Sequence, residues 1–189
     1  MADDEPLTRR NVAPPKPVTP AYLERVALDY LERYSASVAM LRAVLLRRVK
    51  TRCRLRREEP GAFADLVEAT VARAVAAGLV DDSRFAQARL ASLRRRGASS
   101  RIVRAKLAAK GVPRDLVTDA LGNEATTAEE DGVPIEEEAA HAYAKRRRLG
   151  PWRRPDLRGP SRDRDIAAMA RAGFSYSLAS RIVDAETEE

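Results

Sequence analysis

The segment from residue 78 to residue 122 constrains the fold most, because helix stop and start signals alternate along it. Gly78 and Gly97 stand where a helix can end, since glycine readily takes the left-handed backbone of a C-cap. Asp81 and Ser99 follow them and can accept hydrogen bonds from the first amides of the next helix. Apolar residues recur at helical spacing between these signals. The segment therefore predicts short helices in succession, and Phe85 and Leu107 are expected to be buried where two of them cross.

The same helical pattern extends along most of the chain, and no strand signal of any length appears. Acidic, glycine-rich or proline-rich stretches divide the helical segments. The predicted organisation is a disordered tail over 1–18, a helical repeat over 19–80, a second repeat over 81–122, a flexible linker over 123–134 and a third repeat over 135–186. Two further loops are expected, a basic one over 50–61 and a Pro/Gly/Arg-rich one over 149–160.

Residues in one repeat recur at equivalent positions in the next. Ser37, Leu45 and Arg48 are matched by Ser99, Leu107 and Lys110, and the tripeptide Lys110-Gly111-Val112 is matched by Ala172-Gly173-Phe174. A three-helix unit of this size buries little core alone, so neighbouring units must stack. The predicted fold is all-α, with three tandem three-helix repeats in an elongated, curved helical array of right-handed type.

The charge of the chain favours a polyanionic partner. Lys and Arg number 35 against 28 Asp and Glu, for a net charge of +7, while aromatic residues make up only 5%. A basic, aromatic-poor chain fits contact with phosphates better than stacking on bases. Basic clusters recur in register with the repeats, which predicts a continuous basic track. The candidate contacts of this track with nucleic acid or with an acidic protein partner are Arg94, Arg95, Arg96, Arg101, Arg104, Lys110, Arg147 and Arg148. The alternative is that each cluster complements a helix dipole and keeps the surface charged.

Catalysis is disfavoured. His141 is the one histidine and is expected to be structural, and Cys53 is expected to be an incidental loop thiol. No phosphate-binding glycine loop or nucleophile elbow is present, so neither a cofactor nor a bound metal is expected. A single cysteine excludes an intrachain disulfide, and no apolar run is long enough to span a membrane. A cytoplasmic location is therefore expected.

Three stretches of the sequence carry a family resemblance. The run GLVDDSRFA, the following RRRGASSRIVRAKLAAKGV and the later RAGFSY resemble the RecX family of bacterial regulators of the RecA recombinase. The resemblance implies three three-helix repeats in an elongated, curved, monomeric protein without enzymatic activity. It also implies binding in the groove of the RecA–DNA filament, inhibition of filament growth, ATPase and recombinase activity, contact with single- and double-stranded DNA, and a role in DNA repair, recombination and the SOS response. The alternative is a helical DNA-binding protein that uses the same basic residues independently of RecA.

Overall fold

The computed structural model describes residues 16–130 and 134–186, and within them it contains helices and no strand. The all-α prediction is confirmed. The helices are α1 (Pro20–Leu31), α2 (Val38–Arg56), α3 (Ala64–Ala76), α4 (Asp82–Arg94), α5 (Ser100–Ala108), α6 (Arg114–Glu130), α7 (Ile135–Arg147), α8 (Pro155–Arg171) and α9 (Tyr176–Val183), with the 3-10 turns η1 (Pro60–Phe63) and η2 (Gly150–Trp152).

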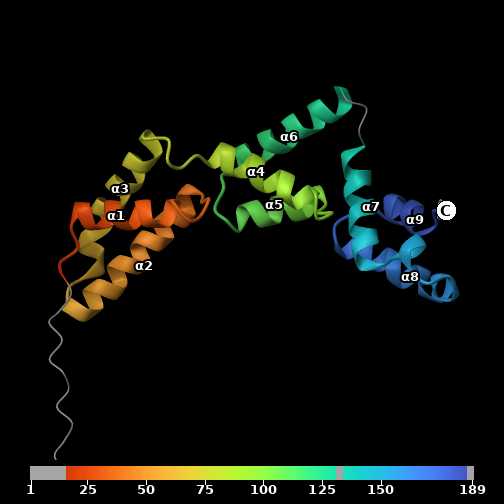
Figure 1. Ribbon diagram of the computed structural model, residues 1–189, viewed down its shortest axis with the longest axis horizontal. Helices are drawn as coiled ribbons and strands as arrows, with labels where there is room; N and C mark the ends of the chain where they lie inside the picture. The colour runs from red at the N-terminus through yellow and green to blue at the C-terminus, as the bar shows by residue number, and fades with distance from the viewer. Residues whose placement is uncertain (1–15, 131–133, 187–189) are drawn as a thin grey trace, which may run out of the picture.

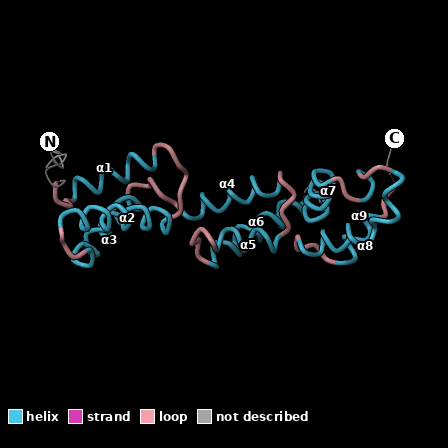
Figure 2. Tube along the Cα trace, turned by 90° about the horizontal axis from the view of Figure 1, so that it is seen from below, coloured by secondary structure: helices cyan, strands magenta, loops and turns pink. Residues whose placement is uncertain are grey.

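The helices gather in three groups of three that lie in a row, so the molecule is elongated (Figures 1 and 2). We call α1–α3 the first group, α4–α6 the second and α7–α9 the third. Helix contacts are concentrated within each group. The buried apolar residues likewise form a separate cluster in each group. This arrangement is the elongated array of three-helix units that the sequence predicts.

Each group is held together by a small core of aliphatic and aromatic side chains. Leu41 and Leu45 are fully buried in the first core, and Met169 is fully buried in the third. Phe85 and Leu107 share the second core, as predicted, with 9% and 0% of their surfaces exposed. The three cores are separate, so each group buries its own apolar side chains, and each core is small.

The helix starts predicted at Asp81 and Ser99 are confirmed, and other helices begin with caps of the same kind. The side chains of Thr19, Ser37, Asp81, Ser99 and Ser175 each accept a hydrogen bond from a backbone amide in the first turn of the following helix. Such caps satisfy amides that have no partner within the helix. They define the first residues of α1, α2, α4, α5 and α9.

Two expectations about the N-terminal part of the chain, the tail over 1–18 and the loop over 50–61, are wrong in part. The predicted tail over 1–18 includes Val18, which is 6% exposed and belongs to the first core, whereas residues 1–15 lie outside the described residues. The predicted loop over 50–61 is helical through Arg56. Cys53 therefore lies on α2 and is fully buried, and burial raises the pKa of its thiol. It is a core residue, not an incidental loop thiol.

Two predicted irregular segments are also largely helical. Helix α6 continues through Glu130, so the linker prediction is wrong for residues 123–130, and residues 131–133 lie outside the described residues. The predicted loop over 149–160 contains η2 and the first turns of α8, with Pro160 inside the helix. The guanidinium of Arg158 donates to the carbonyls of Pro151 and Arg153, which ties the start of α8 to η2.

Candidate nucleic-acid interface

Equivalent serines join the groups at two junctions. At the first junction, between the first and second groups, the Ser37 hydroxyl donates to the carbonyl of Lys110 and accepts from the amide of Met40. At the second junction, between the second and third groups, the Ser99 hydroxyl donates to the carbonyl of Ala172 at 2.6 Å. Each serine thus caps its own helix and binds the end of a helix in the next group. The sequence repeat is therefore also a repeat of the junctions.

Glycines allow the close approach at these junctions. Gly111 and Gly173 have φ values of 72° and 96°, a region that side chains strain to adopt. A Cβ on Gly111 would collide with Ala39, and a Cβ on Gly173 would collide with the hydroxyl of Ser99. The C-terminal turns of α5 and α8 can therefore dock only because glycine follows each helix.

Arg94 belongs to the second junction and not to an exposed basic surface. Its guanidinium forms ion pairs with Glu124 and Glu136, each at 2.9 Å, and donates to the Ser100 hydroxyl at 2.8 Å. Only 12% of its side chain is exposed. Burial opposes the charge and acts to lower the pKa of Arg94, but the bonds to the two glutamates outweigh burial and raise it. The guanidinium of Arg94 is thus already paired within the fold, and a structural role accounts for its position better than the predicted contact with phosphate.

Arg101 also takes part in the second junction. Its guanidinium donates to the carbonyl of Arg171 at 2.7 Å and to the carbonyl of Ala170 at 3.3 Å, at the end of α8. A cation suits that position, because the last carbonyls of a helix have no partners within it. The residue remains exposed, so part of its guanidinium faces solvent.

The other predicted cations lie on the surface. Arg95, Arg96, Arg104 and Lys110 are exposed, and within the described residues their side chains have no hydrogen-bond or ion-pair partner. Arg147 lies 6.0 Å from the ring centre of Tyr143, and the exposed Arg148 ends α7 in a left-handed conformation with φ 54°. These positions occur in both the second and the third group.

Cavities bring some of these cations together with ones that sequence reasoning missed. Arg147 shares a cavity of about 470 Å³ with Arg171 and Tyr143, beside the second junction. Arg104 shares a cavity of about 560 Å³ with Arg114. Arg171 could have been found from its place in the RAGFSY motif. Arg114 follows Pro113 at the start of a helix and gave no comparable signal.

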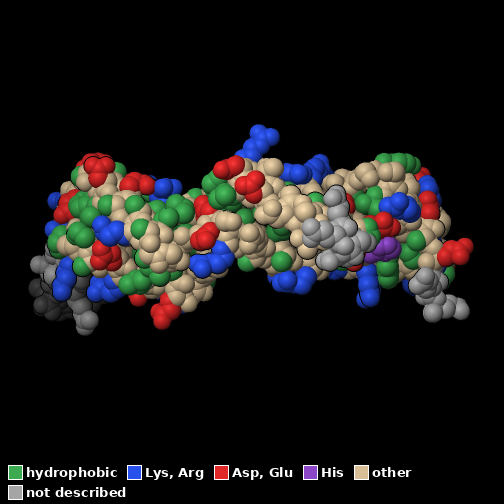
Figure 3. Space-filling view, turned by 90° about the horizontal axis from the view of Figure 1, so that it is seen from above, with side chains coloured by type: hydrophobic (Ala, Val, Ile, Leu, Met, Phe, Trp, Pro, Cys, Tyr) green, Lys and Arg blue, Asp and Glu red, His purple; other side chains and the backbone are tan. Residues whose placement is uncertain are grey.

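The cations do not form one unbroken band on the face seen in Figure 3. There the Lys and Arg side chains stand in separate patches with acidic side chains between them. The pattern fits a surface that contacts a polyanion at several separate points. Each such contact releases counterions and adds affinity without reading base sequence.

Other candidate chemistry finds no centre in the described part of the chain. His141 packs edge-on against Trp152, with 5.7 Å between ring centres, in a structural contact. No group of three or more potential metal ligands gathers among residues 16–130 and 134–186. Of the helices described, none is long and apolar enough to cross a membrane.

Comparison with known proteins identifies the family. Residues 81–121 match the family model for the second three-helix domain of RecX. A protein named "Regulatory protein RecX" from Myxococcus xanthus is 42% identical over 171 residues, which cover 90% of this chain and 88% of the relative. Proteins of the same name from Mycobacterium avium and Agrobacterium fabrum are 34% and 29% identical, over 77% and 86% of this chain and over 83% and 82% of their own lengths. No solved structure gives a significant match. This chain belongs to the RecX family of regulatory proteins.

Proposed function

We propose that this protein binds in the groove of the RecA–DNA filament and inhibits filament growth, ATPase and recombinase activity, without being an enzyme itself. The observation that supports this function is an elongated row of three helical groups whose second and third groups carry exposed, unpaired cations. These cations include Arg95, Arg104 and Lys110. Family membership supports a regulatory role.

The physical argument concerns shape and charge together. A filament groove presents phosphates and protein along its length, and an elongated body can contact both at several points. Cations that are free of internal partners can exchange small counterions for phosphates, and the released ions favour binding. The described helices show no recognition helix with base-reading side chains in a row, so we expect contacts with the backbone that do not depend on base sequence.

The first test separates the proposed function from RecA-independent DNA binding. The DNA-dependent ATPase of RecA is measured during titration with this protein, in parallel with binding to the same single-stranded DNA without RecA. The proposal requires ATPase inhibition well below the concentration that coats bare DNA. Inhibition that appears only at coating concentrations would favour the alternative, a DNA-binding protein that merely competes for the strand.

The second test reverses two exposed charges. The double variant Arg95→Glu and Arg104→Glu should lose RecA inhibition and reduce the dependence of DNA affinity on salt by about one unit of slope for each phosphate that the variant no longer neutralises. A matched control, Arg25→Glu with Arg47→Glu, changes the net charge equally at two exposed, unpaired positions in the first group. If both double variants behave alike, net charge and not the proposed surface governs binding.

A further inference from the structure

Arg89 on α4 differs from every other half-buried arginine in the described part of the chain, because its side chain has no hydrogen-bond, ion-pair or aromatic partner. The partners of the others are Glu68 for Arg42, the Tyr22 ring for Arg52, Glu58 for Arg56, Glu124 and Glu136 for Arg94, Asp165 for Arg153, and the carbonyls of Pro151 and Arg153 for Arg158. Removing a charge from water without a partner is unfavourable. Nothing in the described fold therefore compensates the charge of the half-buried Arg89 guanidinium.

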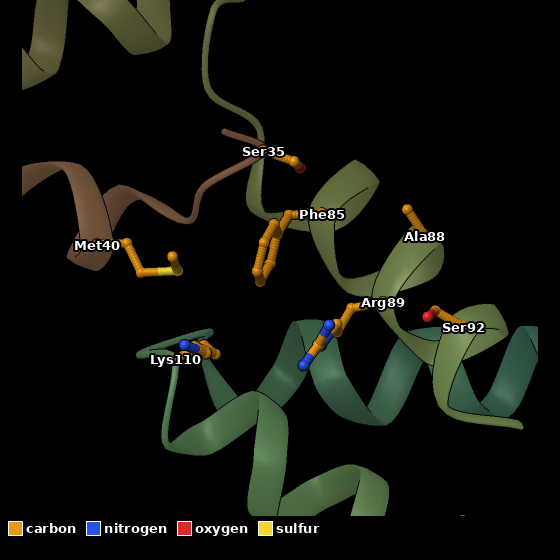
Figure 4. A pocket seen from close by; sticks show the side chains of 7 residues that line it. All are labelled: Ser35, Met40, Phe85, Ala88, Arg89, Ser92 and Lys110. Atoms are coloured by element: carbon orange, nitrogen blue, oxygen red, sulfur yellow. The ribbon is translucent and has the colours of Figure 1, made fainter. Parts of the chain in front are cut away.

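The side chain of Arg89 points into a cavity of about 270 Å³ at the first junction (Figure 4). The cavity is built from both groups, with Ser35 and Met40 from the first and Phe85, Arg89, Ser92 and Lys110 from the second. In Figure 4 the Arg89 guanidinium and the Lys110 ammonium lie on the same side of the opening, with Phe85 and Met40 forming an apolar wall across from them. No acidic residue lines the cavity.

The ammonium of Lys110 is not needed to hold the first junction together. The junction uses the backbone carbonyl of Lys110, which accepts from Ser37. At the second junction the equivalent carbonyl belongs to Ala172 and accepts from Ser99 in the same way. Because alanine serves at one junction, the long cationic side chain at the other is free for a different role.

We propose that this cavity is a binding site for an acidic side chain of a protein partner. The partner's carboxylate would lie between Arg89 and Lys110, and its methylene stem and a neighbouring apolar residue would pack on Met40 and Phe85. Arg89 can bind a carboxylate with two parallel N–H donors, and the flexible methionine can adapt to the group beside it. The site requires both groups, so binding would also favour the observed arrangement of the first junction.

Size and lining favour a carboxylate side chain over nucleic acid. Pockets for small-molecule ligands usually have volumes of about 300–1,000 Å³. A volume of about 270 Å³ suits one or two side chains better than a nucleotide. A phosphate in a strand is also flanked by polar sugars, which gain little from the apolar wall of Met40 and Phe85. We take RecA as the protein partner, and this choice rests on the proposed function. The choice of a carboxylate as the ligand rests on the cavity alone.

The ligand chemistry is tested by NMR of methyl-labelled methionine. Met40 lies in the cavity, and Met169, fully buried in the third core, is an internal control. The probes are a capped pentapeptide with glutamate between two leucines, the same peptide with glutamine, and a tetramer of thymidylate. We expect the glutamate peptide alone to shift the Met40 methyl signal with saturation on the order of millimolar, while Met169 stays unmoved.

Other outcomes of the titration overturn the assignment. Equal shifts from the glutamate and glutamine peptides would show that charge has no part in binding. A saturating shift from the thymidylate tetramer alone would identify a phosphate site instead. Absence of any Met40 shift would show that the cavity binds none of these groups. The substitution Arg89→Gln, which keeps a polar side chain of similar reach, should weaken the glutamate peptide roughly tenfold or more.

The partner is tested separately with RecA. The variant Arg89→Gln should inhibit RecA ATPase at least roughly tenfold more weakly, with affinity for bare single-stranded DNA changed by less than about twofold, because Arg89 is not among the cations proposed to contact phosphate. Arg25→Gln, at an exposed and unpaired position in the first group, is the matched control. Full inhibition by the cavity variant would overturn RecA as the partner, as would a parallel loss of DNA affinity. If the wild-type protein fails to inhibit RecA, the proposed function fails, while the Met40 titration still decides the ligand chemistry.

Discussion

Asp165 lies inside the third core with 1% of its surface exposed, and it joins α8 to η2. Its carboxylate accepts from the amide of Gly150 at 3.0 Å and from two nitrogens of Arg153 at 2.9 and 2.6 Å. Burial acts to raise the pKa of this carboxyl, but the bonds from Arg153 and Gly150 outweigh burial and lower the pKa. The charged form is therefore the one that the fold stabilises.

Replacing this carboxylate should weaken the third group in a pH-dependent way. Asp165→Asn leaves Arg153 without its counter-charge. We expect the free energy of unfolding to fall by about 3 kcal/mol at pH 7. This is the low end for a broken buried pair, because 19% of the Arg153 side chain is exposed. Because the folded pKa is lowered, the stabilisation is complete above the unfolded pKa of about 3.9 and is lost as pH falls through the folded pKa. Urea unfolding of both proteins at pH 7 and between pH 5 and 2 measures the difference.

The matched control for Asp165 is Asp156→Asn. Asp156 pairs with Arg154 on the surface, where the two side chains are 57% and 78% exposed. Such a pair contributes at most about 0.5–1 kcal/mol. A stability gap between the wild type and Asp165→Asn that stays constant down to pH 2 would contradict the assigned role of the carboxylate.

At the residue scale, sequence reasoning succeeded where the interaction is local. Ser99 caps the helix that it precedes, so both partners lie within one turn and the pattern is visible in the sequence. Arg94 was misplaced because it is followed by two more arginines at a helix end, which is typical of a solvated cluster. Its partners, Glu124 and Glu136, are distant in sequence and come from segments with no sign of pairing. Arg89 was missed because a lone arginine four residues after Phe85 resembles an ordinary surface position.

At the element scale, helix ends were predicted less well than helix centres. The stretch from Gly122 to Pro134 has two glycines and several acidic residues that suggested a linker, yet α6 continues to Glu130. A single glycine costs a helix only about 1 kcal/mol, and the alanines and glutamates that follow are good helix formers. The pairing of Glu124 with Arg94 adds a tertiary contact that composition does not reveal. Similarly, α8 includes Pro160, and Arg158, two residues earlier, donates to the carbonyl of Pro151 in η2, a tertiary contact that composition does not reveal either.

Alanine substitutions at the glycines that end helices can separate two costs. One is the strain of a left-handed backbone, and the other is the collision of the new Cβ with a neighbouring group. Gly78 has φ 67° and open space around its Cβ position, so Gly78→Ala should cost only the left-handed strain, about 1–2 kcal/mol. Gly111 has φ 72°, and Gly111→Ala adds a collision with Ala39, for a further ~1–3 kcal/mol. Gly97→Ala should cost most, because its Cβ would meet the backbone of Tyr143, which cannot rotate away. Urea unfolding should rank the variants in this order, and equal losses at Gly78 and Gly111 would show that the first junction opens without cost.

At the scale of the whole molecule, three separate cores are kept in a row by a few polar contacts. The first junction uses Ser37 and a bond at 2.9 Å from the amide of Val38 to the carboxylate of Asp82. The second uses Ser99 and the ion pairs of Arg94. The array itself could be predicted from the sequence repeat, whereas these contacts could not, because they join residues whose pairing depends on how the groups stack. The fold was therefore predictable at the level of units and not at the level of what fixes their orientation.

The second junction provides the test of whether that orientation matters. Arg94→Gln removes a charge that pairs with Glu124 and Glu136. We expect this substitution to destabilise the second junction by roughly 1.5–3 kcal/mol. Because the second and third cores are separate, both should stay folded while the distance between them becomes more variable. Fluorescence energy transfer between labels on α4 and α9 should broaden, and far-UV circular dichroism should be unchanged. Arg181→Gln, which breaks an exposed pair with Glu137 inside the third group, is the control and should leave the distance distribution unchanged.

The consequence for function follows from the same variant. Arg94→Gln retains every exposed cation of the proposed interface, so its affinity for bare DNA should be close to that of the wild type. A groove on a rigid filament requires the three groups in a fixed arrangement, and a loosened junction adds an ordering cost at the moment of binding. RecA inhibition should therefore weaken while DNA affinity persists. If Arg94→Gln broadens the distance distribution and still inhibits RecA at wild-type concentrations, the filament contacts lie within one group, and the array serves only to connect them.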